Sequence, residues 1–112
     1  MTNEQIEELL LEIHRTPLLS MEEELELLEK IQAKGADCYE MQKLGKANLV
    51  YVVSLVRQYK NQGLELEELI EAGKEGVRRA ARTYRSDSDI SFRKYAVGQM
   101  RQCIQTAIEL KK

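Results

Sequence analysis

Most of the side chains that could do chemistry stand in the last third of the chain. Between positions 78 and 101 there are seven basic residues and only two acidic ones. Such a segment can bind a phosphate backbone, although a run of charge is also typical of a solvated helix face. The basic residues are Arg78, Arg79, Arg82, Arg85, Arg93, Lys94 and Arg101.

Residues suited to catalysis or metal binding are sparse. The single histidine, His14, is next to Arg15 at an expected helix end, where a capping or surface role is typical. The spacing of Gly73 and Gly76 matches no phosphate-binding loop. Cys38 and Cys103 are too far apart in sequence for a metal-binding or redox motif, so we expect two buried structural thiols in a reduced cytoplasmic protein. The sequence therefore predicts no enzyme, no metal and no cofactor.

Length and charge favour one small globular domain. The chain has 112 residues, of which 43% are hydrophobic and 32% charged. We see neither a membrane span nor a secretory signal. Residues 1–45 carry 4 Lys/Arg against 11 Asp/Glu, a net of −7, whereas residues 46–112 carry 13 against 8, a net of +5. The two parts therefore differ in electrostatic character.

Apolar periodicity and capping residues predict a compact all-α bundle of five to six helices. The first helix ends at Thr16-Pro17, and the second begins at a capping box, Ser20 with Glu23, and ends at Gly35. The third runs from Asp37 to Tyr59 and is apolar on most faces, so we expect it to be central. A short helix then ends near Gly73, another follows from Gly76, and the last begins at Asp89 or Ser91.

Four stretches in order resemble the sigma factors of bacterial RNA polymerase. Residues 17–24 resemble Leu-Leu-Thr-x-Glu-Glu-Glu, and residues 46–61 resemble Ala-Asn-Leu-Arg-Leu-Val-x-x-x-Ala-x-x-Tyr. Residues 63–77 resemble Gly-Leu-x-x-x-Asp-Leu-Ile-Gln-Glu-Gly-Asn-x-Gly-Leu, and residues 92–108 resemble Phe-Ser-Thr-Tyr-Ala-x-Trp-Trp-Ile-Arg-Gln-Ala-Ile. The resemblance implies one domain, with residues 1–35 matching the segment before the main domain (region 1.2) and 36–112 the −10-recognition and core-binding domain (region 2).

The resemblance implies two partners. One is core RNA polymerase, held through a coiled coil of its largest subunit; the other is promoter DNA, read as the single non-template strand of the −10 element. Anti-sigma or other regulatory proteins are further implied partners, and no membrane is. The polymerase-binding positions are Glu68, Glu71, Ala72, Lys74 and Arg78.

DNA binding is implied for aromatic, amide and basic residues of the last helices. Aromatic faces stack on unpaired bases, glutamine amides bond base edges, and cations contact phosphates. This chain departs from the family at the tryptophan pair, where it has Gly98 and Gln99, so its ability to melt DNA is in question. The positions carried over are Asn48, Arg82, Arg85, Phe92, Arg93, Lys94, Tyr95, Gln99, Arg101, Gln102 and Gln105.

An alternative function belongs to another class. The absent tryptophans and the acidic first half fit a protein-interaction module that docks on RNA polymerase, or competes there with sigma factors, without opening DNA. Surface exposure of the aromatic and amide residues near the end of the chain is what the DNA-binding interpretation requires.

Overall fold

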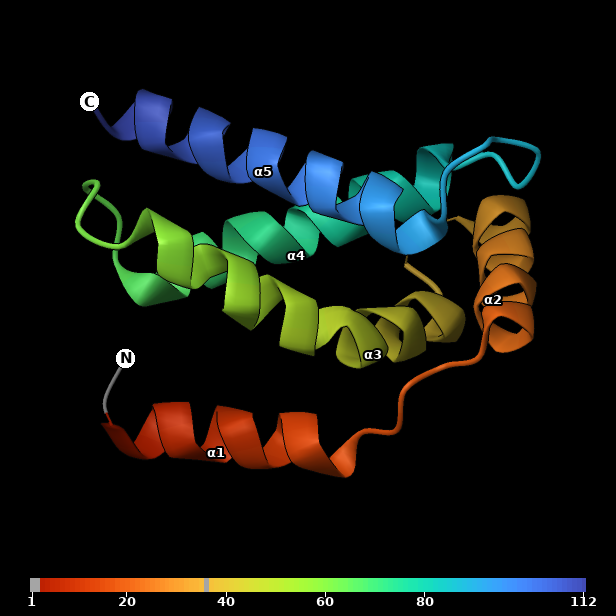
Figure 1. Ribbon diagram of the computed structural model, residues 1–112, viewed down its shortest axis with the longest axis horizontal. Helices are drawn as coiled ribbons and strands as arrows, with labels where there is room; N and C mark the ends of the chain where they lie inside the picture. The colour runs from red at the N-terminus through yellow and green to blue at the C-terminus, as the bar shows by residue number, and fades with distance from the viewer. Residues whose placement is uncertain (1–2, 36) are drawn as a thin grey trace.

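The computed structural model describes residues 3–35 and 37–112, and the regular structure within them is entirely helical. The elements are α1 (Asn3–Arg15), α2 (Met21–Lys34), α3 (Tyr39–Val56), the 3-10 turn η1 (Arg57–Tyr59), α4 (Leu66–Thr83) and α5 (Phe92–Lys111). In Figure 1, α4 and α5 form a hairpin beside α3, α2 crosses one end of this group, and α1 runs along the far side of α3. The predicted all-helical fold is confirmed.

Helix ends follow the local signals in the sequence. The Ser20 hydroxyl accepts a hydrogen bond from the Glu23 backbone N–H, and the Glu23 carboxylate accepts one from the Ser20 N–H, each at 3.1 Å. Gly35 ends α2 with φ +100°, a conformation that costs glycine little. Ser91 caps α5 by accepting a hydrogen bond from the Lys94 N–H. These three predicted boundaries are confirmed.

One predicted boundary is wrong: the segment from Leu66 to Thr83 is one continuous helix rather than two. Helix α3 ends at Val56, and η1 extends the helical structure to Tyr59, where the sequence predicts its end. The glycines of α4 are packing residues instead of helix ends. A Cβ on Gly73 would lie 2.7 Å from a methyl group of Val52, and one on Gly76 would lie 2.4 Å from the Cα of Met100.

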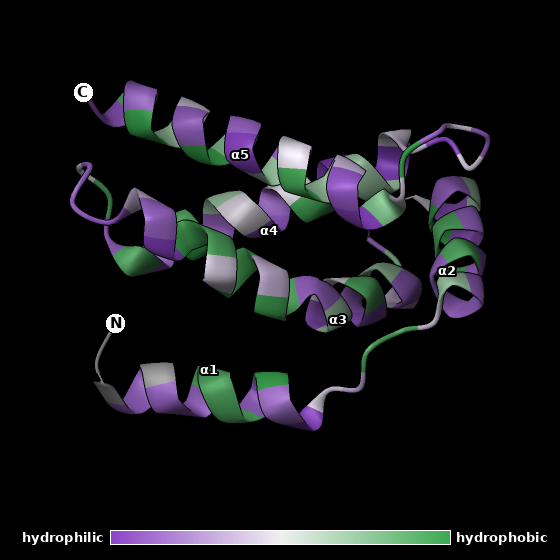
Figure 2. Ribbon diagram, in the orientation of Figure 1, coloured by the Kyte–Doolittle hydropathy of each residue, from purple (hydrophilic) through white to green (hydrophobic). Residues whose placement is uncertain are grey.

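The core lies between α3, α4 and α5, and α2 closes one end of it. Helix α3 packs against each of the other four α-helices, as predicted for the central helix. Figure 2 shows the hydrophobic residues of α5 on the side that faces α4. The largest fully buried side chains are Phe92, Ile31, Leu44, Leu69, Met100, Ile104, Val52 and Val56.

Polar contacts fix α2 and the loop after α4. The Gln32 side-chain amide donates to the carbonyl oxygens of Ala81, at 3.1 Å, and Tyr84, at 2.8 Å, which lie at the C-terminal end of α4. The Tyr84 hydroxyl donates to the Ile90 carbonyl oxygen at 2.8 Å and so closes the loop that leads to α5. The two thiols are free; Cys103 is buried as predicted, whereas Cys38 is only half-buried.

A pair of alanine substitutions tests the helix contact at Gly76. Gly76→Ala should lower the free energy of unfolding by about 1–3 kcal/mol, because the added methyl group overpacks the α4–α5 contact. Gly98→Ala is the matched control: its Cβ would meet nothing within 4 Å. This exposed α5 position should gain about 0.5–1 kcal/mol from helix propensity. Urea unfolding measures both, and equal effects would contradict the close contact.

Candidate functional site

The outer face of α5 carries a row of basic and amide side chains. Lys94, Arg101, Gln102 and Gln105 are all exposed, and their spacing of three, four and seven residues places them along one side of the helix. Gly98 stands in the middle of this row with open space above it. We call these five residues the α5 row. Gln102 and Gln105 can therefore present their amides to the same ligand.

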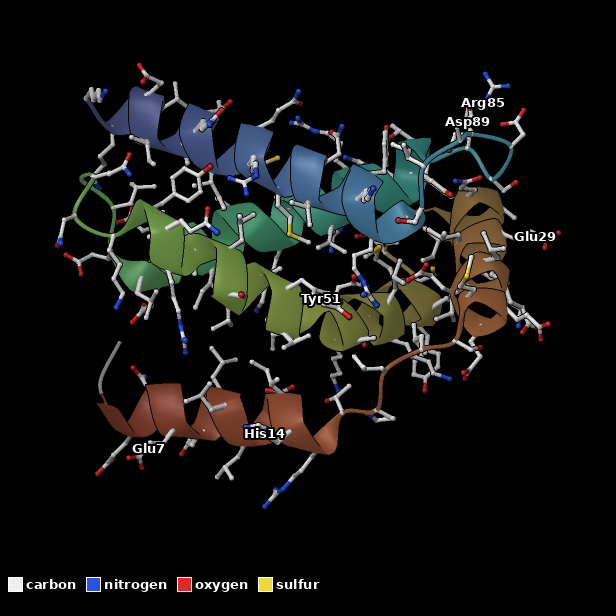
Figure 3. The ribbon with its side chains drawn as sticks, viewed as in Figure 1. Glu7, His14, Glu29, Tyr51, Arg85 and Asp89 are labelled. Carbon is white, nitrogen blue, oxygen red and sulfur yellow. The ribbon has the colours of Figure 1, made fainter. Side chains whose placement is uncertain are left out.

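Two arginines of α5 rest on tyrosines of α3 and η1. The Arg93 guanidinium carbon lies 4.5 Å from the centroid of the Tyr51 ring, a cation–π distance. Eight residues later, Arg101 donates to the Tyr59 hydroxyl at 3.3 Å. Figure 3 labels Tyr51 on α3, near the start of α5. The sequence did not lead us to predict either tyrosine as a site residue. The signal that could have found them is that Tyr51 and Tyr59 have the same separation as Arg93 and Arg101.

The aromatic residues of the hairpin have separate roles. Phe92 is 2% exposed and lies edge-on to Tyr84, with ring centroids 5.4 Å apart, so it is a core residue. The prediction that Phe92 offers a stacking face is wrong in this structure. Tyr95 is half-buried, and its hydroxyl lies 2.6 Å from the Thr83 hydroxyl. Only Tyr95 of the two predicted aromatics keeps part of its ring at the surface.

A surface groove of about 500 Å³ lies between α2, the loop of residues 84–91 and the start of α5. Its apolar wall includes Met21 and Ile90, and Glu24, Asp89 and Arg93 supply the charge. Burial raises the pKa of the Glu24 carboxyl, an effect that the positive charge of Arg93 opposes. The groove thus combines apolar walls with two acids and one base.

Asn48 does not lie on the surface. Its side chain is 3% exposed, and its amide nitrogen donates to the Leu44 carbonyl oxygen at 2.9 Å. It lines a small hollow together with Tyr51, Glu24 and other residues. Asn48, predicted as a DNA-binding residue, is thus buried in this structure, with one amide N–H bonded within α3.

The other predicted DNA-contacting residues are scattered. Arg85 is exposed in the loop and pairs with Asp87 at 3.3 Å; Figure 3 labels Arg85 there, beside Asp89. Arg82 is on α4 and lies 3.7 Å from Glu75. Gln99 is half-buried, beside the contact at Gly76. The structure does not bring these residues into the α5 row.

The outward face of α4 carries acids toward its N-terminal end and arginines toward its C-terminal end. One carboxylate oxygen of Glu75 lies 3.7 Å from Arg78, and the other lies 3.7 Å from Arg82. Arg78 also donates to Asp37, in the loop between α2 and α3, at 2.9 Å. Helical spacing puts Glu68, Glu71, Ala72, Glu75, Arg78 and Arg82 on this face, which we call the α4 ladder. Glu75, its central acid, was missed by sequence reasoning.

Further ion pairs anchor the edges of the α4 ladder. Lys74, a predicted polymerase-binding residue, stands beside the ladder and pairs with Glu71 at 3.6 Å. Glu68 accepts a hydrogen bond from the Glu65 backbone N–H at 3.2 Å and pairs with Lys111 of α5 at 3.3 Å. The Glu65 N–H and then Lys111 hold the pKa of the Glu68 carboxyl below its usual value. Glu68 is therefore charged at neutral pH.

Neither a metal-binding cluster nor a membrane-spanning helix is found within residues 3–35 and 37–112. No group of three His, Cys, Asp or Glu side chains there is arranged to hold a metal ion. The helices within those ranges also lack the combined length and apolar character needed to cross a membrane. The two exposed surfaces, the α5 row and the α4 ladder, are thus the main candidates for function.

Comparison with known proteins gives consistent matches. Residues 44–112 match the family model described as Sigma-70 region 2. The RNA polymerase sigma factors SigA of Lactococcus lactis subsp. cremoris and of Clostridium acetobutylicum are each 37% identical over 87% of this chain, and the matches cover 27% and 25% of those relatives. SigA4 of Synechococcus elongatus is 35% identical over 96% of this chain and 41% of its own length. The chain thus spans about a quarter of the length of the SigA relatives.

Substitutions of the two aromatics of α5 test their different roles. Phe92→Ala should lower the free energy of unfolding by about 3–5 kcal/mol, because it leaves a cavity in the core. Tyr95→Phe should cost only about 0.5–1.5 kcal/mol, since it removes one hydrogen bond to Thr83. Chemical denaturation followed by circular dichroism compares the two. A Phe92→Ala variant as stable as the wild type would show that the ring is not a core element.

Proposed function

The chain belongs to the sigma-70 family, through the part that the family model describes as region 2, and from this premise we propose that it binds core RNA polymerase with the α4 ladder and promoter DNA with the α5 row. Sigma factors are transcription initiation factors and not enzymes, so the family assignment confirms the prediction that the chain has no catalytic role. Residues 1–35 would supply the segment that precedes the recognition domain.

The α4 ladder supports the polymerase contact. The flanks of a coiled coil carry charges of both signs at regular spacing, and a second helix pairs with them when its own charges match in sign and position. At seven-residue intervals along one side of α4, Glu68 and Glu75 supply two acids and Arg82 supplies a base. Half-buried Ala72 leaves a low point in the ladder where a partner side chain can approach. Several of these charges already pair within the chain. Their contacts with the partner's charges therefore orient the complex more than they strengthen binding.

The α5 row supports the DNA contact, and its exposure is the observation that carries this part of the proposal. Lys94 and Arg101 can neutralise phosphates, which gives affinity without sequence preference. Gln102 and Gln105 can bond base edges, and Gln suits the edge of adenine. The partly exposed ring of Tyr95 lies beside the row and offers a face on which an unpaired base can stack. The apolar wall of the groove near Ile90 can contact the flat face of a base.

Gly98 limits what this surface can do. It occupies the middle of the α5 row, where the family has a tryptophan, and no side chain fills the space above it. Removing a base from a duplex costs a few kcal/mol, which aromatic stacking has to offset. Capture of DNA that is already single-stranded therefore fits the chain better than melting it unaided. The alternative function, docking on polymerase without opening DNA, follows if the α5 row binds no DNA at all.

Binding of a single-stranded −10 oligonucleotide tests the DNA contact. We expect saturable binding that prefers the −10 sequence over a scrambled strand and weakens as salt increases. Tyr95→Ala should reduce affinity by about 5- to 150-fold, since stacking contributes about 1–3 kcal/mol per base. Arg82→Ala should leave sequence preference unchanged. Tyr39→Ala, an exposed tyrosine on α3, is the matched control. Binding unaffected by Tyr95→Ala would refute this role, and failure to bind either strand would favour the alternative.

Retention of the chain by immobilised core polymerase tests the α4 ladder. Glu75→Lys removes the acid that pairs with Arg78 and Arg82 and leaves three cations in succession, so it should lower retention at least about tenfold. Glu29→Lys makes the same charge change at an exposed position of α2, labelled in Figure 3, and should bind like the wild type. Equal retention of both variants would place the polymerase contact elsewhere.

A further inference from the structure

Among the described side chains of helix α1, none is fully buried. It packs mainly on α3, and a connection of residues 16–20 joins it to α2. Leu9 and Ile13 are only half-buried against the core, whereas α2, α3, α4 and α5 each contribute fully buried residues. Figure 1 shows α1 set apart from the group formed by the other helices. Among the described side chains, α1 is therefore held to the core less tightly than the other four α-helices.

Two hollows lie along this contact and show that α1 fills it incompletely. One, of about 260 Å³, lies beside Ile13 and His14 of α1 and over Lys46 and Val50 of α3. The other, of about 230 Å³, lies beside Leu9 and Leu10 and is lined by residues that include Val53, Arg57, Lys60 and Ile70. Larger apolar side chains at the α1 positions would have room in both hollows.

Helix α1 carries its acids mainly on its outward side, whereas the surface beneath it carries cations. Glu4, Glu7, Glu8 and Glu12 make α1 acidic, and all four are exposed; Glu7 is labelled in Figure 3. The surface beneath α1 has an apolar centre with three cations, and we name it the α1-facing surface: Lys46, Val50, Val53, Arg57, Lys60 and Ile70. Within the part of the chain that the structure describes, none of these three cations is in an ion pair. They remain available to carboxylates.

We propose that the α1-facing surface is a docking site for an acidic amphipathic helix of a partner protein, which displaces α1 and takes its place. The apolar stripe of such a helix would cover Val50, Val53 and Ile70, and its flanking acids would pair with Lys46, Arg57 and Lys60. A mode in which a helix lies in an apolar groove is common in protein recognition. Helix α1 is the intramolecular occupant: it is also acidic and amphipathic, but it leaves two hollows and its Glu7 points away from the cations.

Competition with α1 determines how tightly the partner helix must bind. A tethered helix acts at an effective concentration of about millimolar order, so a partner must bind more tightly than α1 does. Filling the two hollows provides that advantage, because each added apolar group is removed from water. The partner therefore differs from α1 in carrying larger apolar side chains at the positions over the hollows. This proposal does not depend on the DNA and polymerase contacts proposed above.

A fluorescent peptide probe tests the proposal on the full chain. The probe is a copy of residues 3–15 with Leu10→Phe and His14→Phe, and the unmodified copy is its reference. By fluorescence anisotropy, the probe should bind at least about tenfold more tightly than the reference. Ile13→Asp, which weakens the apolar contact of α1, should tighten probe binding by a similar factor. Circular dichroism checks that this variant keeps the other helices.

Charge variants show whether the probe binds the proposed surface. Arg57→Glu combined with Lys60→Glu should abolish probe binding. Lys30→Glu, at an exposed position of α2, should leave it unchanged. The proposal is overturned if the probe fails to bind the Ile13→Asp chain, or if Lys30→Glu weakens binding as much as the double variant. It is also overturned if light scattering finds a dimer that Ile13→Asp dissociates, since the occupant would then be α1 of a second copy.

Discussion

The close approach of α4 and α5 at Gly76 is the constraint on which the arrangement of both surfaces depends. A Cβ at this position would lie 2.4 Å from the Cα of Met100, so the two helices can meet at this distance only around a glycine. Their pairing brings Thr83 to Tyr95 and Glu68 to Lys111, and it closes the core over Met100. The positions of both surfaces of the α4–α5 hairpin therefore depend on the absence of a side chain at Gly76.

The hairpin presents two surfaces of different electrostatic character on adjoining helices. The α4 ladder carries charges of both signs and is largely paired internally, while the α5 row is basic and rich in amides. Such a division suits two partners that must be bound together, one with mixed charge and one with phosphates. The acidic helices α1 and α2 lie outside this pair, and α1 occupies a surface whose cations suit a third kind of partner.

Within the aromatic cluster, two residues stabilise the fold and the third has part of its ring at the surface. Phe92 fills the core and sets the start of α5, and Tyr84 holds the loop closed through Ile90. Tyr95 is packed on one side and fixed by Thr83, which leaves the remaining part of its ring at the surface in a defined orientation. A ring held in this way loses little conformational freedom when a base stacks on it. The buried members thus orient the exposed one.

The sequence by itself determined the helical fold, the caps at Ser20 and Ser91, the end of α2 at Gly35, and the exposed pair Gln102 and Gln105. These features depend on hydrogen bonds within a few residues and on the helical period, both of which are local. Only the tertiary structure decided that α4 continues through Gly73 and Gly76, that Phe92 and Asn48 are buried, and that Arg93 rests on Tyr51. Each of these depends on which residue from a distant part of the chain lies opposite, and local periodicity carries no information about that.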